Sequence, residues 1–522
     1  MLTGIIKKGE YFDSVSLMLV DKEINQLKSV KDATVVMGTK ENKAILKNAG
    51  LYLAKFDACS DTDLLIALNL ADGADADAVL TQIGMMLKEI TNKKSDAEAY
   101  FPKSLEGALE INPAANLVLI SLAGKYAGDV AAAALKNDKD VMLFSDNVPL
   151  EREIELKKYA LEKELLMMGP DCGTAIINGV PLAFANVVKE GNIGIVAASG
   201  TGLQEVSSLI SNLGGGISQA IGTGGRDIKQ EVGGLMFIYA MKLLQQDENT
   251  EVIVLIAKPP HPEVLEKINS ELKNITKPVV TIFLGEDTAK LNNPNVKSAQ
   301  TLEEAALLAR KLSKNESVEN VDEELDKRRS IYPSLFQTQV EQIKSSRKYV
   351  RGLFSGGTLC DEAQLIFRKE FQNIYSNRAP EQKYQLPDPL KSKEHTVLDL
   401  GEDEFTVGRL HPMIDFTLRN QRIVEEARDP ETAIILLDIV LGYGANQEPV
   451  KNILPTLKQA QQIAPEIIFI GSVVGTEEDP QNREEVIRTL EENGMIIMPS
   501  NAAAAELTLY ILQQLQKDAF EN

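Results

Sequence analysis

The sequence predicts a multidomain α/β protein whose larger domains are built on parallel sheets. Short apolar runs alternate with segments of helical periodicity along most of the chain, and three of these runs end in a glycine-rich turn. Strands joined by helix-length segments form βαβ units, in which parallel strands pair and helices cover the sheet. A length of 522 residues and a hydrophobic content of 44% are typical of three or four globular domains.

Residues 1–92 are predicted to form a small α/β domain. No motif within it indicates a particular chemistry. The apolar patterns predict strands at 15–20, 34–37 and 64–69, and helices at 22–29, 40–49 and 76–90.

Residues 93–188 form the next predicted domain. It has neither a G-x-G-x-x-G motif after a strand nor a P-loop, so it lacks both nucleotide fingerprints. Asp171 and Cys172 follow its last strand, at the carboxyl end where ligands of α/β proteins usually bind, and are possible site residues. For Cys172 a buried structural thiol is the preferred interpretation, since no histidine is near it in the sequence. The predicted strands are 117–121, 141–144 and 166–168, and the predicted helices are 125–135 and 150–162.

Residues 189–315 repeat the pattern, with strands predicted at 193–198, 217–221, 252–257 and 279–284. The turn after the first strand opens a helix and consists of Ser199, Gly200 and Thr201. A strand, a tight turn and a helix start in this order direct unpaired N–H groups and the positive helix end at one place, which suits an anion.

A second glycine-rich loop follows the strand at 217–221. It contains Gly222, Gly224, Gly225 and Arg226. Arg226 is a candidate clamp for a phosphate or carboxylate, and the alternative is an ion pair with Asp227 or with a surface carboxylate.

Residues 316–345 are charged and are expected to form a linker or a solvated helix, and residues 346–522 a last α/β domain. In that domain the strand at 349–354 ends in a turn that echoes the first one and consists of Ser355, Gly356, Gly357 and Thr358. A segment that includes Arg409, His411 and Asp415 is expected to open the next helix. Further strands are predicted at 396–400, 434–439, 467–474 and 495–498.

Charge and cysteine content restrict the class of protein. A net charge of −21 argues against a nucleic-acid partner, because phosphates require basic patches. No apolar run is long enough to span a membrane, and the first residues do not form a signal peptide. Cys59, Cys172 and Cys360 are far apart without metal-ligand spacing, so we expect a disulfide-free cytoplasmic protein with no metal site.

Several segments resemble the succinyl-CoA synthetase α subunit in order and spacing: Gly-Pro-Asp-Cys at 169–172, the strand and turn at 191–201, the loop at 221–227 and Lys-Pro-Val-Val at 277–280. Residues 429–444 are similar to the carboxy-terminal domain of the β subunit, and the chain as a whole is most similar to the FdrA family. The resemblance implies a Rossmann-like CoA-binding-type domain at 93–188 and two flavodoxin-like ligase-type domains at 189–315 and 346–522.

The chain departs from the synthetases at the phosphorylated histidine, which that family carries shortly after the Lys-Pro-Val-Val strand. The only histidines here are His261, His395 and His411, and none lies shortly after that strand. Asp171 also stands where the synthetases have asparagine, and no segment remains for a nucleotide-binding ATP-grasp domain. In the synthetases two helix N-termini converge on the phosphohistidine, and the resemblance implies that the turn at 199–201 and the segment at 409–415 provide them here.

The FdrA resemblance implies a subunit of an oxamate carbamoyltransferase of purine catabolism, which acts with companion subunits. Phosphate would split oxalurate into oxamate and carbamoyl phosphate, with His411 or Arg226 as the catalytic donor and His261 as a possible neighbour. One alternative is an acyl-CoA synthetase component that needs a separate ATP-grasp chain, so CoA is a possible ligand. Another alternative is a non-catalytic scaffold that binds CoA or an anion.

Overall fold

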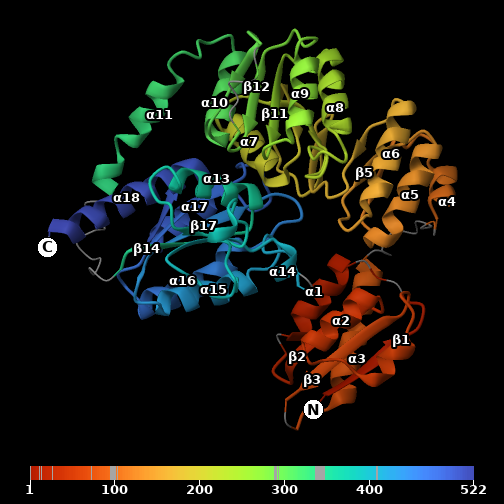
Figure 1. The fold of residues 1–522 in the computed structure, drawn as a ribbon. Coiled ribbons are helices and arrows are strands. Elements are labelled where there is room, and N and C mark those ends of the chain that lie inside the picture. Colours follow the sequence, from red (N-terminus) through yellow and green to blue (C-terminus); the bar gives the residue numbers. More distant parts are fainter. Residues whose placement is uncertain are drawn as a thin grey trace. The chain divides into compact units, whose positions relative to one another are not determined.

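The computed structural model describes residues 2–10, 12, 14–25, 27–71, 73–93, 102, 104–286, 291, 293–335, 347–406 and 409–521 (Figure 1). The chain divides into two compact units. The first comprises Met1–Ala115 and Asp403–Leu410, and the second comprises Asn116–Glu402 and His411–Asn522.

The first unit contains a three-stranded antiparallel sheet with the order β1-β3-β2. The strand predicted at 15–20 is wrong, because those residues lie in α1. Leu17, Val20 and Ile24 are buried at intervals of three and four, which is the period of a helix face. The strands are β1 (Leu2–Lys7), β2 (Val30–Met37) and β3 (Leu64–Leu70), and the helices are α1 (Ser14–Asn25), α2 (Lys40–Asn48), α3 (Ala76–Lys93), α4 (Leu105–Ile111) and α14 (Asp403–Thr406).

The second unit begins with a small parallel sheet of the order β4-β5-β6. Its strands are β4 (Leu117–Ile120), β5 (Asp140–Leu143) and β6 (Met167–Met168), connected by α5 (Gly124–Lys136) and α6 (Leu150–Glu162). These elements agree with the βαβ pattern predicted from the sequence.

A seven-stranded sheet follows, with the order β13-β12-β11-β9-β10-β7-β8. Its first five strands are parallel, and the hairpin of β7 and β8 pairs antiparallel to β10. The strands are β7 (Thr174–Ile177), β8 (Val180–Ala183), β9 (Glu190–Ala197), β10 (Ile217–Gly222), β11 (Val252–Ala257), β12 (Val279–Phe283) and β13 (Val296–Ser298). The helices are α7 (Gly200–Asn212), α8 (Leu235–Gln246), α9 (Pro262–Leu272), α10 (Leu302–Ser313) and, beyond the sheet, α11 (Val321–Arg329).

The last sheet is wholly parallel, with the order β15-β16-β14-β17-β18-β19. Its strands are β14 (Tyr349–Phe354), β15 (Ile374–Tyr375), β16 (His395–Asp399), β17 (Thr432–Val440), β18 (Ile468–Val474) and β19 (Met495–Met498). Its helices are α13 (Gly357–Phe367), α15 (Thr417–Arg428), α16 (Pro449–Ile463), α17 (Arg483–Glu492) and α18 (Asn501–Glu521).

One hydrophobic core joins the two larger sheets. It contains Leu203 of α7, Leu302 of α10, Leu359 of α13 and Leu507 of α18, all fully buried. Helices α7, α10, α13 and α18 therefore lie between the sheets, as Figure 1 also shows. This packing brings the starts of α7 and α13 together.

Two buried glutamates also connect the seven-stranded sheet and its helices with the last sheet and its helices. Glu205 is the fifth residue after the glycine that starts α7, and its Oε1 accepts the N–H of Asn501 at the start of α18 over 2.9 Å. Glu362 is the fifth residue after the glycine that starts α13, and its Oε1 accepts the N–H of Leu302 at the start of α10 over 2.7 Å. A glutamate from a helix beside each sheet thus caps a helix that belongs to the other sheet.

Candidate functional site

The turns that the sequence singled out after β9 and β14 meet in the structure. Ser199 caps α7 by accepting the N–H of Gly202 over 3.0 Å, and its Oγ shares a hydrogen bond of 2.6 Å with Oγ1 of Thr358. The N–H of Thr358 donates to Oγ1 of Thr201 over 3.4 Å. Because the first N–H groups of a helix have no partner within it, two positive helix ends point into one place.

The partner of α7 is α13 and not the segment at 409–415, which corrects the sequence-based expectation. Gly408 lies outside the described residues, and the exposed Arg409 belongs to the first unit, so it is not placed at this junction. Asp415 precedes α15 and accepts the N–H of Thr417 over 2.7 Å. Its carboxylate therefore serves the start of a different helix.

The turn before α13 already holds a carboxylate of the chain itself. Asp438 of β17 accepts the N–H groups of Ser355 and Gly356 over 2.8 Å each, and the Ser355 hydroxyl over 2.9 Å. Arg419 of α15 lies behind it, with 3.1 Å from Nη1 to Asp438 Oδ1, and both side chains are fully buried. The N–H groups of Ser355 and Gly356 are therefore occupied by Asp438, and that of Thr358 is directed to Thr201 at the start of α7.

A charged group at this junction was not anticipated from the sequence. Lys258, directly after β11, pairs with Asp361 of α13 over 2.7 Å. Arg378 lies 3.7 Å from Asp361 and 3.5 Å from Asp399, and also pairs with Glu402. We call these five residues the junction cluster. The signals available in the sequence were a charged residue directly after β11 and an aspartate ending β16, at the carboxyl edges where sites form.

His411 adjoins the junction cluster through Gly401. Its Nδ1 accepts the N–H of Met413 over 3.2 Å, so Nε2 carries the proton in the neutral ring. Burial and the nearby Arg419 lower the pKa of His411 to about 4, so the ring is neutral at pH 7. The catalytic role that the sequence suggested for His411 remains a proposal.

Replacing Gly401 with alanine is expected to lower the free energy of unfolding by about 1–3 kcal/mol. A Cβ there would come within 2.6 Å of His411 Nε2 and 3.1 Å of Asp399 Oδ1, and both side chains are held by other contacts. Denaturant unfolding measures the change. Gly173→Ala is the matched control, since nothing lies within 4 Å of a Cβ at Gly173. Equal stabilities of the two variants would contradict the close approach.

The second glycine-rich loop packs against the chain. A Cβ at Gly222 would lie 2.4 Å from the carbonyl oxygen of Thr174, and one at Gly224 would lie 2.1 Å from that of Pro170. Gly224 also has a φ of +83°, in the region that favours glycine. A Cβ at Gly225 would have room, because the nearest atom would be 4.0 Å away. Close approach to the loop at 169–174 explains the first two glycines without a ligand.

Arg226 points to α6 and not to the helix junction. Its Nε pairs with Glu153 over 2.8 Å, and Nη2 donates to the carbonyl oxygen of Val148 over 2.8 Å. Lys157 lies 2.8 Å from both Glu153 and Asp227, and these last three side chains are fully buried. The bidentate clamp expected from the sequence is thus an ion-pair network that fixes α6 to the loop after β10.

The other possible site residues have local roles in the structure. Cys172 is buried, its thiol donates to the carbonyl oxygen of Gly222 over 3.3 Å, and burial raises its pKa to about 12, so it is no thiolate nucleophile at neutral pH. His261 caps α9 by accepting the N–H of Glu263 at Nδ1. Asp171 is exposed with a φ of +58°, and its N–H donates to the carbonyl oxygen of Ser145 over 3.0 Å.

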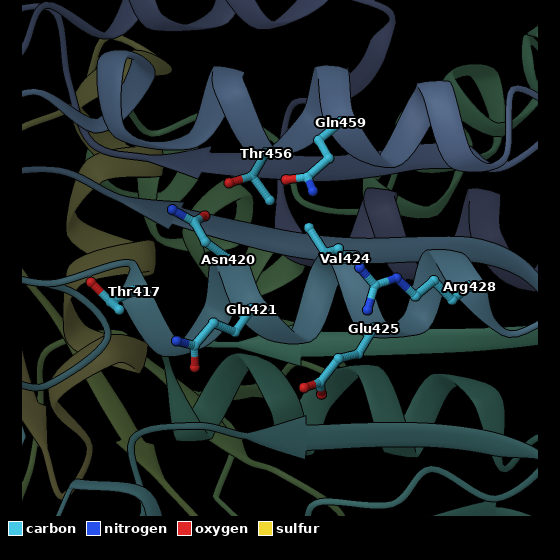
Figure 2. A pocket seen from close by; sticks show the side chains of 8 residues that line it. All are labelled: Thr417, Asn420, Gln421, Val424, Glu425, Arg428, Thr456 and Gln459. Atoms are coloured by element: carbon cyan, nitrogen blue, oxygen red, sulfur yellow. The ribbon is translucent and has the colours of Figure 1, made fainter. Parts of the chain in front are cut away.

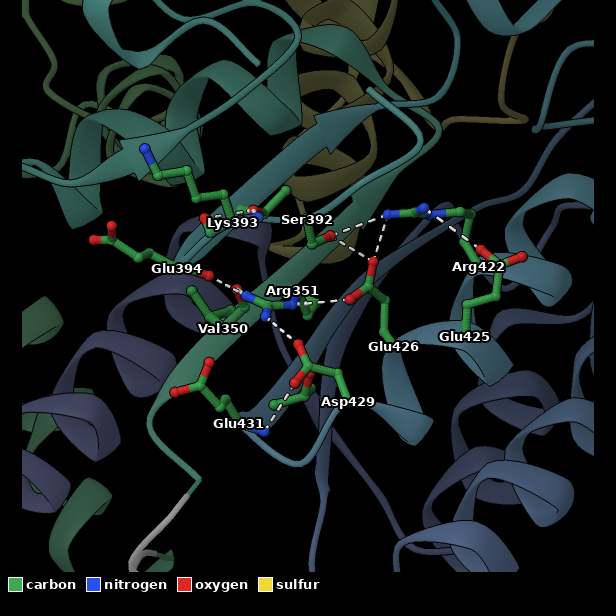
Figure 3. Close-up of polar contacts among 12 residues, drawn as sticks. Val350, Arg351, Ser392, Lys393, Glu394, Arg422, Glu425, Glu426, Asp429 and Glu431 are labelled. Carbon is green, nitrogen blue, oxygen red and sulfur yellow. Dashed lines mark hydrogen bonds and ion pairs between the residues drawn. The ribbon is translucent and has the colours of Figure 1, made fainter. Parts of the chain in front are cut away.

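An open groove of about 450 Å³ lies between α15 and α16. Figure 2 shows that its walls carry polar side chains, including Asn420, Gln421 and Gln459. A buried network lies at the amino-terminal part of β14, where Arg351 pairs with Glu426 over 2.8 Å and with Asp429 over 2.6 Å (Figure 3). It joins the strand to α15 and takes no part in the helix junction.

Three family models match parts of the chain. They are "CoA-ligase" over residues 353–511, "CoA binding domain" over residues 188–285, and "AllF, heavy metal-associated domain" over residues 1–101. The protein YahF of Escherichia coli K12, described as uncharacterized, is 43% identical over 503 residues, which cover 95% of this chain and 96% of YahF. The chain belongs to the YahF family. The CoA-ligase and CoA-binding matches agree with the synthetase-type fold that the sequence implied.

More distant relatives of this YahF-family chain are ligase subunits. The sulfoacetate-CoA ligase subunit SqwL of Acholeplasma is 31% identical and covers 29% of the chain and 52% of SqwL. The succinate–CoA ligase α subunit of Methanothermobacter thermautotrophicus is 26% identical and covers 33% of the chain and 57% of that subunit. The chain thus matches about half the length of these two subunits. A solved dinucleotide-forming acetyl-coenzyme A synthetase 1 from Candidatus Korarchaeum cryptofilum has a TM-score of 0.32 and 14% identity, and covers 78% of this chain and 85% of that one.

The name of the amino-terminal model implies a heavy metal, but the described residues do not fit one. They contain no group of three or more His, Cys, Asp or Glu side chains that could hold an ion. Cys59 is the cysteine of this unit, its thiol faces the carbonyl oxygen of Lys55 at 3.8 Å, and burial raises its pKa. Soft metals bind the thiolate, which this setting disfavours. Within the described residues, no helix is long and apolar enough to cross a membrane.

Proposed function

We propose that this chain is the acyl-transfer subunit of a CoA-ligase-type enzyme and binds a phosphate-bearing acyl group between the starts of α7 and α13. The observation that carries the proposal is the meeting of the two helix starts at Ser199 and Thr358. Two helix N-termini favour an anion, and their N–H groups are suited to a phosphoryl oxygen or to the oxyanion of acyl transfer. The matches to CoA-ligase and CoA-binding domains support the same class of chemistry.

Within this class we propose carbamoyl transfer to phosphate. Phosphate attacks the carbamoyl carbon of oxalurate, the bond from that carbon to the inner nitrogen breaks, and oxamate and carbamoyl phosphate are released. The proton lost by phosphate goes to the leaving nitrogen. The segment directly after β12 contains no histidine in the sequence, and the proposed reaction needs no phosphoenzyme. The FdrA resemblance and the match to an AllF domain support the same reaction.

The second candidate is acyl-CoA formation in a complex with a nucleotide-binding chain. It is favoured by the two CoA-related family models and by the similarity to ligase subunits. Both candidates require companion subunits, and both pass an acyl group to or from a phosphate oxygen. Carbamoyl phosphate formed from oxalurate and phosphate identifies the first reaction, and ADP formation that depends on an acid and CoA identifies the second.

The anion site is tested by placing a charge in it. Thr358→Asp is expected to weaken binding of inorganic phosphate at least about tenfold and to lower turnover with it, because a carboxylate would occupy the helix junction. Thr358→Asn has the same shape without the charge and is expected to keep most of the affinity. Calorimetric titration of the full chain, with and without the companion subunits, measures both variants. If Thr358→Asp and Thr358→Asn bind phosphate equally well, the anion does not bind at this junction. If phosphate binds but neither reaction occurs, the chain is a non-catalytic scaffold.

A further inference from the structure

The junction cluster has more acids than bases. Asp361, Asp399 and Glu402 face only two cations within the cluster, Lys258 and Arg378. With every group ionised, the cluster carries one surplus negative charge next to a site built for an anion. Like charges this close disfavour ionisation, most strongly for the least solvated acid of the three.

Asp399 is the most buried of the three acids. Its side chain is 5% exposed, compared with 20% for Asp361 and 37% for Glu402. Its Oδ1 accepts the N–H of Gly401 over 2.9 Å, and Arg378 approaches Oδ2 only to 3.5 Å. Burial therefore outweighs these contacts and raises the pKa of Asp399 to about 6.

The carboxyl of Asp399 lies directly at the start of α13. A Cβ on Gly357 would come within 2.4 Å of Asp399 Oδ2, so only glycine leaves room for the carboxyl there. The Asn377 side chain holds the Asp399 backbone on both sides, accepting its N–H over 3.0 Å and donating to its carbonyl oxygen over 2.9 Å. The carboxyl of Asp399 is thus placed against Gly357, the first residue of α13.

We propose that Asp399 is the proton-transfer residue of the helix junction and that it takes up a proton when a dianion binds there. The inference rests on the proposed function, which places the anion at the starts of α7 and α13. In carbamoyl transfer the protonated carboxyl gives this proton to the nitrogen of the departing oxamate, and the carboxylate that is left takes the proton that HPO₄²⁻ loses as its oxygen attacks. Oxalurate and HPO₄²⁻ contain the same atoms and charge as oxamate and carbamoyl phosphate, so Asp399 ends the cycle in its starting state.

The other groups around Asp399 do not supply this proton. Lys258 and Arg378 are cations held in ion pairs, and Asp361 is in contact with both. Glu402 is more exposed and pairs with Arg378. His411, on the other side of Gly401, is neutral at pH 7, and its Nε2–H contributes a donor but no charge. Asp399 is therefore the group of this cluster that titrates in contact with the helix start.

Sulfate is the probe of choice, because it is a dianion that does not itself titrate near neutral pH. Binding of sulfate to the full chain at pH 7, measured calorimetrically in two buffers of different ionisation enthalpy, should take up part of one proton. The Asp399→Asn variant should bind sulfate at least as tightly and take up no proton, since it lacks the carboxylate. Asp388→Asn is the control. Its side chain is 44% exposed, and a hydrogen bond from Lys391 lowers its pKa.

Each outcome decides a different point. Proton uptake that persists in Asp399→Asn would overturn the role of Asp399 while leaving the anion site intact. A wild-type chain that binds no sulfate would overturn the anion site and this inference together. In the assembled enzyme, turnover of Asp399→Asn should fall about 100-fold or more and lose the limb of the pH profile near pH 6, whereas Asp388→Asn should keep both. An unchanged limb near pH 6 in Asp399→Asn would also overturn the proposal.

Discussion

Replacing Lys157 with methionine should lower the free energy of unfolding by about 3–5 kcal/mol. The ammonium group lies 2.8 Å from Glu153 and 2.8 Å from Asp227, and all three side chains are 0% exposed. It also donates to the carbonyl oxygen of Thr223 over 3.1 Å. Without it, two buried carboxylates keep only Arg226 as a cation, and Arg226 reaches only Glu153. Uncompensated buried charge is among the costliest single changes in a protein.

Lys158→Met is the matched control, because the neighbouring lysine is on the same helix but exposed. It should shift the first unfolding transition little, since exposed substitutions usually change stability by only a few tenths of a kcal/mol. Adding Glu153→Gln to Lys157→Met should restore part of the loss by removing one orphaned charge. If Lys157→Met and Lys158→Met unfold alike, the buried network does not stabilise α6.

The parallel sheets were predictable because their strands are short runs of mostly apolar residues. β11, β14 and β19 have the bounds that the sequence predicted, and β9 and β10 differ only at their ends. A strand that is buried on both faces gives a nearly continuous apolar run, which differs from the spaced apolar residues of a surface helix. The amino-terminal unit was harder, because a short apolar segment such as 15–20 fits both periods until the rest of the helix is known.

The helix starts of the candidate site were also visible in the sequence, since the two Ser-Gly turns look alike. What the sequence could not supply was their pairing. The resemblance to the synthetases assigned the second start to the segment at 409–415. The strand order decides instead: β14 lies between β16 and β17, so its turn is central in the last sheet and meets α7.

The junction cluster was missed for a related reason. Lys258, Asp361, Arg378 and Asp399 lie on four separate segments, and each alone is an ordinary surface-type residue. Arg378 lies in the connection between β15 and β16, whose path no periodicity predicts. Strand order and loop path are non-local, so they bring these charges together only in the folded chain.

Glu205 and Glu362, the buried glutamates between the two larger sheets, should make stability depend on pH. Burial raises the pKa of Glu205 from 4.5 to about 8 and that of Glu362 to about 7, and the charge of Glu362 also raises the pKa of Glu205. A raised pKa means that the folded state holds the proton at pH values where the unfolded chain has released it. The stabilisation is complete below about pH 4.5 and is lost as the pH rises through about 7 and about 8.

Glu205→Gln should therefore stabilise the protein at alkaline pH, by about 4–5 kcal/mol above pH 8, and leave it nearly unchanged in acid. The glutamine oxygen can still accept the N–H of Asn501, so the cap on α18 is kept while the ionisable group is removed. Unfolding midpoints measured from pH 5 to pH 9 should converge at the acid end and separate at the alkaline end, with a smaller gap for Glu362→Gln. The exposed Glu492→Gln on α17 should follow the wild type throughout. Parallel curves for Glu205→Gln and wild type would mean that Glu205 is ionised in the folded protein, and the interface between the two larger sheets would then have to contain a compensating cation.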